Sequence, residues 1–387
     1  MKILILTDYY PPDKIGGVGE IAKNLKESYQ AKGHEVWVLT TGQAQDDPKV
    51  IRSSKSLIKG AFLNNLRALK IIKQQKIDVI NLHQSSTTLF LLAKLFNERF
   101  PKIINSFQVS YFSEFAHIKT VKVKGKEFKP ARKEHIEKWV FSPVHVFLGW
   151  IGYVCADEVT VVSSENKKEF MRTYNMTSSK NIKIIANGVN PGNFTPGKPR
   201  LDQKFLDQLA GKTALLYVGV FRARKRVFNL LFALQKVVKI NSNVVLVLVG
   251  GGRDYEADIL KLIDDLGLKK HVIFVGKVPN TEVVNYLRVC DVFCTLSSYE
   301  GMPIAILEAM ASGKAILTSK ASGMIDLIDD GKDGYLTDVD NIDQIAQKMQ
   351  LLVDNPKKTK QMGEQARKKI LQSYNWNDIA DKYIKLF

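Results

Sequence analysis

Two carboxylates, Glu300 and Glu308, are the residues of this 387-residue chain whose type and spacing most directly indicate chemistry. An apolar run, Val292–Leu296, precedes them and predicts a buried strand, and apolar residues return at helical spacing from Ile304 onward. Pro303 suits the first turn of a helix, where its missing N–H is not needed. The sequence therefore predicts a strand, a loop and a helix. Glu300 comes just before the helix and Glu308 lies inside it, at most about 12 Å away at the helical rise per residue.

The charge and hydrogen-bonding capacity of this stretch suit a particular form of ligand. Free N–H groups at the start of a helix attract anions, and a carboxylate on either side of them accepts hydrogen bonds from hydroxyl groups. A nucleotide-sugar, built of ribose, pyrophosphate and sugar, has the matching anionic middle and hydroxyl-rich ends. The alternative is that Glu300 is only a carboxylate beside a helix start and that Glu308 is solvated.

The stretch Ser297–Gly313 as a whole resembles the E-x7-E signature of family 4 glycosyltransferases, which are retaining enzymes of the GT-B fold. The resemblance implies an α/β protein of GT-B architecture, in which two doubly wound Rossmann-like domains face a cleft. It also implies that Glu300 is catalytic and orients the hydroxyl groups of the donor sugar, and that Glu308 binds the ribose. Donor contacts are further implied for the residues that follow Glu300, which are Gly301, Met302, Pro303 and Ile304.

A basic loop follows another predicted strand, Ala214–Gly219. Members of the resembled family usually carry Arg directly after the glycine of this strand and Lys five residues beyond that Arg. Lys225 matches the second position, whereas Val220 stands at the first. The resemblance implies that Lys225, aided by Arg222, is catalytic and stabilises charge on the leaving nucleoside diphosphate.

The remaining arginines of this loop, Arg224 and Arg226, admit two interpretations. Arg224 can supply the charge that Val220 does not. A run of basic residues more often forms a solvated face, and this is the expectation for both side chains.

Glycine-rich loops follow several other predicted strands. Gly17-x-Gly19-x-x-Ala22 matches the dinucleotide fingerprint of oxidoreductases, but a long Pro-containing loop separates it from its strand and no acidic residue ends the second strand. The glycine pair instead resembles the N-terminal glycine loop of the glycosyltransferase family, where bare backbone lets a phosphate or acceptor approach closely. Donor binding is implied for this loop and for the ends of three further strands, at Gly16, Gly17, Gly219, Gly250, Gly251, Lys277 and Val278.

Two polar side chains lie at the ends of strands in the first half. His83 ends the predicted strand Asp78–His83 and is expected to face the cleft, with a structural role as the alternative. Gln108 follows the strand Lys102–Ser106, at a position where many relatives carry a histidine close to the transferred sugar. Both are predicted on the acceptor and sugar side. Gln108 can hydrogen-bond a sugar hydroxyl but cannot act as a general base.

Strand and helix patterns alternate through both halves of the chain, which predicts parallel sheets covered on both faces. A Pro- and Gly-containing segment, Phe194–Pro199, separates the halves and predicts a linker. The predicted domains are residues 1–195 on the acceptor side, 196–370 for the nucleotide-sugar, and a final helix, 371–387, that crosses back to the first domain.

The net charge of +18 implies an anionic partner. An insert at 111–154 places lysines beside aromatic residues, which suits a peripheral contact with an anionic membrane; a solvated basic loop before a core helix is the alternative. Trp139–Ala156 carries no charged residue and is barely long enough for a membrane span. Pro143 and the strand that follows favour a buried or interfacial helix. No nucleic-acid-binding motif is present, so no nucleic acid partner is expected.

Metal and localisation signals are sparse. Asp338-Val339-Asp340 mimics the D-x-D metal motif of a different glycosyltransferase fold, but its place in a late turn predicts a surface position. No metal or other cofactor is expected. Three cysteines form no disulfide framework, and Met1–Asp8 lacks the length and cleavage site of a signal peptide. The expected location is cytoplasmic, at the inner face of the membrane.

The resemblance implies a glycosyltransferase that moves a sugar from a UDP- or GDP-linked donor, with retention, to a lipid-linked or glycan acceptor at the membrane surface. One alternative is a sugar-nucleotide epimerase of the same fold, which needs no acceptor. Another is a non-enzymatic basic protein that binds nucleic acid or another polyanion. The latter would explain the charge but leave Glu300, Glu308 and Lys225 unexplained.

Overall fold

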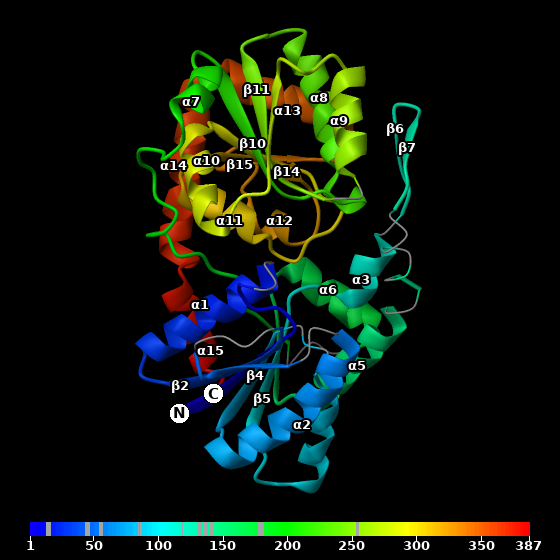
Figure 1. Ribbon diagram of the computed structural model, residues 1–387, viewed down its shortest axis with the longest axis vertical. Helices are drawn as coiled ribbons and strands as arrows, with labels where there is room; N and C mark the ends of the chain where they lie inside the picture. The colour runs from blue at the N-terminus through cyan, green and yellow to red at the C-terminus, as the bar shows by residue number, and fades with distance from the viewer. Residues whose placement is uncertain are drawn as a thin grey trace. The chain divides into compact units, whose positions relative to one another are not determined.

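The computed structural model describes residues 1–12, 17–42, 47–53, 57–83, 85, 87–117, 119–130, 134, 136, 138–139, 142–176, 182–252 and 255–387. The chain forms two compact units (Figure 1). The first comprises Met1–Phe115, Ile136–Gly188 and Trp376–Phe387, and the second comprises Ala116–His135 and Val189–Asn375.

The first unit is built on a seven-stranded parallel sheet in the order β3-β2-β1-β4-β5-β8-β9. Its strands are β1 (Lys2–Thr7), β2 (Glu35–Thr41), β3 (Val50–Ser53), β4 (Val79–His83), β5 (Lys102–Phe107), β8 (Glu158–Val161) and β9 (Ile182–Ile184). The helices are α1 (Gly17–Ala31), α2 (Leu57–Gln75), the 3₁₀ helix η1 (Leu89–Phe96), α3 (Tyr111–Ala116), α5 (Ser142–Cys155), α6 (Ser164–Thr173) and α15 (Trp376–Ile384).

The second unit holds a six-stranded parallel sheet in the order β12-β11-β10-β13-β14-β15. Its strands are β10 (Thr213–Val220), β11 (Val244–Gly251), β12 (Val272–Gly276), β13 (Val292–Thr295), β14 (Ala315–Ser319) and β15 (Gly334–Thr337). The α-helices are α7 (Gln203–Leu209), α8 (Val227–Val238), α9 (Glu256–Asp265), α10 (Val283–Val289), α11 (Ile304–Ala311), α12 (Gly323–Leu327), α13 (Ile342–Asp354) and α14 (Pro356–Ser373). Short 3₁₀ helices, η3 (Ala223–Lys225) and η4 (Asn280–Glu282), follow β10 and β12.

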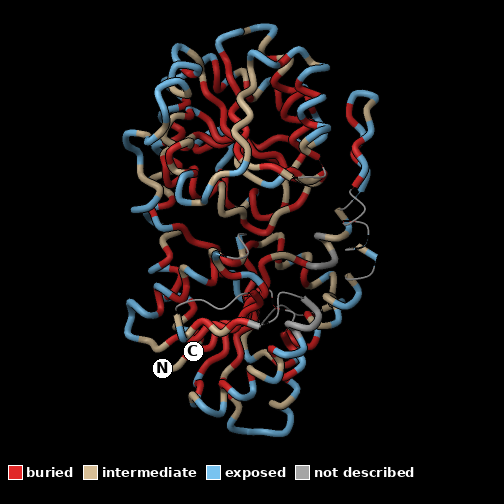
Figure 2. Tube along the Cα trace, in the orientation of Figure 1, coloured by how far each residue is buried: buried red, intermediate tan, exposed pale blue. Residues whose placement is uncertain are grey.

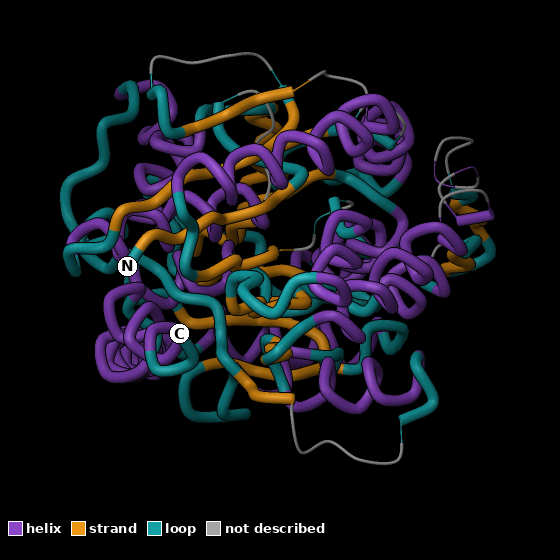
Figure 3. The backbone as a smooth tube through the Cα atoms, turned by 90° about the horizontal axis from the view of Figure 1, so that it is seen from below, coloured by secondary structure: helices purple, strands orange, loops and turns teal. Residues whose placement is uncertain are grey.

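Both sheets are covered on their two faces, so their strands are continuous apolar runs rather than alternating ones. Ile3–Leu6 of β1 and Val244–Val249 of β11 are each no more than 1% exposed. Figure 2 shows the strands as buried and the outer sides of many helices as exposed, and in Figure 3 helices lie to both sides of the strands. This confirms the predicted alternation of strand and helix.

The sequence analysis treated 111–154 as one insert of the first domain, but the structure divides it between the two units. Its middle part, 116–135, belongs to the second unit, where β6 (Val121–Val123) and β7 (Lys126–Phe128) form an antiparallel hairpin. The Phe128 ring stacks on Phe228 of α8 with 3.5 Å between ring centroids. The alternation of apolar and basic residues in this hairpin buries one face, which a solvated loop would not do.

The other boundaries also shift. The chain leaves the first unit after Gly188 and re-enters it at Trp376, rather than at the predicted 195 and 371. One helical segment of the first unit, Leu89–Phe96, is the 3₁₀ helix η1 rather than an α-helix. Part of Trp139–Ala156 forms α5, which is partly buried as expected. In the described part of the chain, no helix combines the length and apolar character needed to cross a membrane.

Candidate active site

The carboxyl ends of β10 and β13 lie side by side in the sheet of the second unit. The two strands pair with Leu215 opposite Val292, and the progression of strands along the chain reverses between them. In doubly wound sheets, ligands bind outside the carboxyl ends of the strands at such a point. Because η3 follows β10 and the loop to α11 follows β13, the sheet brings Lys225 and Glu300 together.

Three side chains converge on one carboxylate oxygen at this point. Glu300 Oε1 lies 2.6 Å from Arg224 Nη1 and 2.6 Å from Lys225 Nζ. Ser297 Oγ donates to the same oxygen at 3.0 Å. Arg224 Nη1 also donates to the Tyr299 carbonyl at 3.1 Å. The two loops are thus tied together by one buried charge cluster.

The protonation state of Glu300 follows from two opposed effects. Burial raises the pKa of its carboxyl, while the charges of Arg224 and Lys225 and the hydrogen bonds to it lower it, and the outcome is a pKa of about 2. The side chains of Glu300, Arg224 and Lys225 are only 12%, 18% and 19% exposed, so water screens their charges little. Glu300 is therefore ionised at neutral pH and can accept hydrogen bonds but cannot donate a proton.

Burial is also the largest influence on the Lys225 ammonium and lowers its pKa, while Glu300 acts in the opposite direction. Two cations around one carboxylate leave the cluster with an excess positive charge. Such a cluster attracts a further anion, and diphosphates are suited to both Arg and Lys.

The arginines of this loop differ from the sequence-based expectation. Arg224 and Arg226 were expected to be solvated, but the Arg224 side chain is 18% exposed and that of Arg226 only 4%. The reason is tertiary: Arg224 reaches the loop after β13, and Arg226 Nη2 lies 3.4 Å from Asp340 Oδ1. The structure thus places Arg224 against Glu300, whereas Arg222 was predicted as the second catalytic cation, and the role of Arg222 stays a prediction.

The helix predicted after Glu300 begins at Ile304, and Pro303 is its N-cap residue with extended backbone. Glu308 is buried on this helix, so the alternative of a solvated side chain is wrong. Sequence reasoning missed Gly323, at the start of α12. A Cβ atom at this position would come within 1.6 Å of the Gly301 carbonyl oxygen, so only glycine lets α12 approach the loop that carries Glu300.

The predicted donor-binding glycines occupy strand ends and loops. Gly250, at the end of β11, has φ +124° and a Cβ there would meet the Gly219 carbonyl oxygen at 2.0 Å, so its glycine is already required by packing. Gly251 is the last residue of β11, and Lys277 and Val278 directly follow β12. Gly17 begins α1, while Gly16 lies outside the described residues. Their contacts with a donor stay predictions.

The two residues predicted on the acceptor and sugar side lie in the first unit. His83 is fully buried rather than facing an open surface: its ring packs edge-on against Tyr383, and Nε2 donates to Asn81 Oδ1 at 2.9 Å. Burial lowers its pKa to about 3, so the ring is neutral. These contacts favour the structural alternative for His83. Gln108 is also buried, and neither atom of its amide has a hydrogen-bond partner among the described residues.

No group of three or more His, Cys, Asp and Glu side chains in the described ranges is placed to hold a metal ion. Asp338 and Asp340 of the D-x-D sequence are exposed, in agreement with the predicted surface position. The contacts of Glu300 described above involve neither of these two aspartates.

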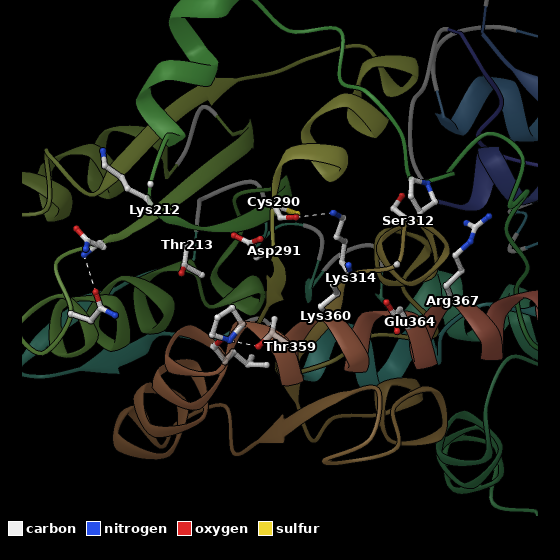
Figure 4. Close-up of a pocket in the computed structure, with 17 residues that line it drawn as sticks. Lys212, Thr213, Cys290, Asp291, Ser312, Lys314, Thr359, Lys360, Glu364 and Arg367 are labelled. Carbon is white, nitrogen blue, oxygen red and sulfur yellow. Dashed lines mark hydrogen bonds between the residues drawn. The ribbon is translucent and has the colours of Figure 1, made fainter.

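A cavity of about 750 Å³ lies elsewhere in the second unit (Figure 4). Thr213, Asp291 and Lys314 line it. Thr213 is the first residue of β10, and Asp291 and Lys314 directly precede β13 and β14. Because the strands are parallel, this is the edge of the sheet opposite to Glu300 and Lys225. The cavity is therefore separate from the candidate active site.

Family models match two consecutive parts of the chain. The model described as Glycosyltransferase Family 4 matches residues 15–193, and the model described as Glycosyl transferases group 1 matches residues 201–369. The chain belongs to the glycosyltransferases of family 4, of which the group 1 model describes the second part. The predicted resemblance is thereby confirmed, and the Glu300 cluster lies within the group 1 part.

The similarity to known proteins covers most or all of the chain of this glycosyltransferase. An uncharacterised glycosyltransferase of Methanocaldococcus jannaschii is 24% identical over 100% of this chain and 98% of its own length. The alpha-monoglucosyldiacylglycerol synthase of Streptococcus pneumoniae is 24% identical over 87% of this chain and 75% of its own. The solved structure of Anabaena HepE with UDP and glucose matches with a TM-score of 0.77 and 18% identity, over 100% of this chain and 99% of that one. The predicted GT-B fold is thereby confirmed.

Proposed function

We propose that this glycosyltransferase moves a sugar from a UDP- or GDP-linked donor, with retention, to a lipid-linked or glycan acceptor at the cytoplasmic face of a membrane. The observation that carries the proposal is the ionised Glu300 carboxylate between Arg224 and Lys225 at the switch point of the second sheet. The complex of HepE with UDP and glucose supports a nucleotide-sugar donor. Similarity to the pneumococcal alpha-monoglucosyldiacylglycerol synthase supports a lipid acceptor.

In the proposed reaction, the bond between the anomeric carbon of the sugar and the diphosphate oxygen breaks. The acceptor hydroxyl oxygen bonds to that carbon on the same face, and its proton passes to the leaving phosphate oxygen. Retention then needs no protein base. Lys225, with Arg224 or Arg222, stabilises the charge that gathers on the diphosphate. Glu300 accepts hydrogen bonds from the sugar hydroxyls, because its carboxylate stays ionised.

The remaining contacts of the donor are assigned on the same basis. At the start of α11, the backbone N–H groups of Met302 and Ile304 face the diphosphate, and Glu308 binds the ribose. The glycine loops and the Lys277–Val278 segment contact the nucleotide. The proposal includes no metal ion, since Arg and Lys take the role of charge stabilisation.

A panel of UDP- and GDP-sugars, incubated with and without membrane-lipid extract, tests the proposal. Release of free nucleotide that depends on one sugar donor and increases with the lipid extract is the expected result, together with a glycolipid in which the anomeric configuration of the donor is kept. Conversion of a nucleotide-sugar to its epimer without acceptor would instead identify an epimerase. Turnover of no donor would contradict the proposal.

Gln108 offers a test that separates function from stability. A buried amide without a partner costs about 1–3 kcal/mol, and a ligand hydroxyl would satisfy it. We expect Gln108→Leu to raise the free energy of unfolding by about 1 kcal/mol and to lower the transfer rate at least about tenfold. Chemical denaturation and transfer kinetics measure both quantities. Unchanged transfer would remove Gln108 from the sugar side, and a loss of stability would show that the amide supports the fold.

A further inference from the structure

Three elements of the first unit, α2, η1 and α5, are joined side by side. The Phe90 backbone N–H of η1 donates to Asn65 Oδ1 of α2 at 2.9 Å. On the other side, Thr88 Oγ1 donates to the Leu148 carbonyl of α5 at 3.2 Å, and Lys94 Nζ donates to the Cys155 carbonyl at 3.2 Å. The 3₁₀ helix η1 therefore connects α2 to α5 in one layer, and Figure 1 shows these two helices close together.

The inner side of this layer packs on the sheet. Each element contributes buried residues to the same hydrophobic core as β1, β2 and β4, namely Ala68 and Ile71 from α2, Phe90 and Leu91 from η1, and Ile151 and Cys155 from α5. The opposite sides of the three elements therefore face outward together.

That outward side is apolar, which is unusual for the surface of a folded protein. Phe62 is 65% exposed, Leu95 69% and Phe96 90%. Of the 23 large apolar side chains that are exposed in the described part of the chain, twelve lie on these three elements. We call these twelve the apolar face, and its members are Phe62, Leu63, Leu66, Leu69, Leu89, Leu92, Leu95, Phe96, Val144, Phe147, Trp150 and Val154.

The charges on the same elements select the partner. The sequences of α2, η1 and α5 contain no Asp or Glu, whereas α2 and η1 carry basic residues that include the exposed Lys70 and Lys73. Two copies of this face would bring like charges together, which disfavours self-association. Apolar and aromatic side chains among basic residues match the acyl boundary and headgroups of an anionic membrane.

We propose that the apolar face inserts into the surface of an anionic membrane and holds the enzyme there as a peripheral protein. The apolar residues of β6 and β7 are not part of this face, because Val121, Val123 and Phe128 are buried in the hydrophobic core of the second unit. The inference deepens the proposed function, since a lipid-linked acceptor requires the enzyme to work at a membrane. The apolar face lies on the first unit, and the contacts of Glu300 in the second unit do not include any of its residues.

Flotation with phosphatidylglycerol-containing vesicles, compared with pure phosphatidylcholine, tests the inference. The intact protein is expected to float with the anionic vesicles. The double variant Phe96→Ser, Phe147→Ser is expected to lower the bound fraction at least about tenfold, because both rings leave the acyl boundary. The pair Lys70→Glu, Lys73→Glu is expected to weaken binding and its dependence on the anionic lipid. These side chains are exposed, so the fold should tolerate the changes.

The matched control is Ile240→Ser, Leu371→Ser, which removes two exposed apolar side chains outside the apolar face and is expected to bind as the intact protein does. Hydrolysis of the donor in lipid-free solution should be equal in all these proteins, so that loss of membrane binding is distinguished from loss of the proposed activity. Failure of the intact protein to float, or equal loss in the control, would overturn the inference. A different result would also overturn it: sedimentation shows that the intact protein is a dimer, the Phe96→Ser, Phe147→Ser variant is a monomer, and the intact protein binds no vesicles.

Discussion

Lys225→Ala is expected to lower the rate of sugar transfer by about 10²–10³-fold. The Lys225 ammonium is held 2.6 Å from Glu300 by the turn after β10, and preorganised donors that meet developing charge contribute effects of this size. The loss should appear in kcat, because charge on the diphosphate grows as the sugar departs. Steady-state kinetics with the donor identified by the panel, and circular dichroism to verify folding, measure it.

The arginines of the same loop provide graded comparisons for this experiment. Arg224→Ala removes the other cation that contacts Glu300 and should cost more than Arg222→Ala, since the contacts of Glu300 described above include Arg224. The reverse order would assign the catalytic charge to Arg222, as predicted from the sequence. Near-normal turnover of Lys225→Ala would remove Lys225 from the mechanism.

Glu300→Gln is expected to lower transfer by a similar factor while the fold persists. The amide cannot replace an ionised carboxylate that accepts hydrogen bonds from sugar hydroxyls and positions two cations. Breaking a buried ion pair by removing one partner typically costs about 3–5 kcal/mol, and the Gln side chain retains part of the hydrogen bonding, so a smaller loss of stability is expected. Denaturant unfolding and transfer kinetics check the two effects.

The pH dependence gives this variant an internal check. The pKa of Glu300 is lowered from 4.5 to about 2 in the folded protein, so its stabilising effect is present above pH 4.5 and is lost as the pH falls toward 2. The difference in unfolding free energy between the intact protein and Glu300→Gln should therefore shrink over that range. Ser297→Ala, which removes only the hydroxyl that donates to Glu300, serves as the control and should affect transfer far less. A fully active Glu300→Gln protein would refute the assignment.

The Glu300 cluster also accounts for a departure from the family pattern. Val220, at the usual Arg position, is more than half exposed and contributes no charge. Arg224 instead approaches Glu300 from within the η3 turn, and the Arg224 carbonyl accepts a hydrogen bond from the Ser298 backbone N–H at 2.9 Å. The positive charge thus reaches the site from a different backbone position.

Several features of this glycosyltransferase could be predicted from its sequence because they depend on local patterns. Continuous apolar runs between helical segments indicated the two parallel sheets, and the positions of Lys225 and Glu300 after their strands indicated the sheet edge where the two side chains meet. The roles of these residues and of Glu308 stay predictions. Strand ends and the loops that follow them are adjacent in sequence, so a linear pattern identifies them.

Other features were decided only by the tertiary structure. The partner of Arg224, the burial of Arg226 and the need for glycine at Gly323 all depend on loops that are distant in the chain and meet across paired strands. The hairpin in the segment 116–135 belongs to the second unit because Phe128 stacks on Phe228 of α8. The apolar face arose because three elements bury one side on a common core, which fixes the direction of the other. Sequence patterns indicate which residues can be buried or paired, whereas the partner of each residue depends on contacts between segments that are distant in the chain.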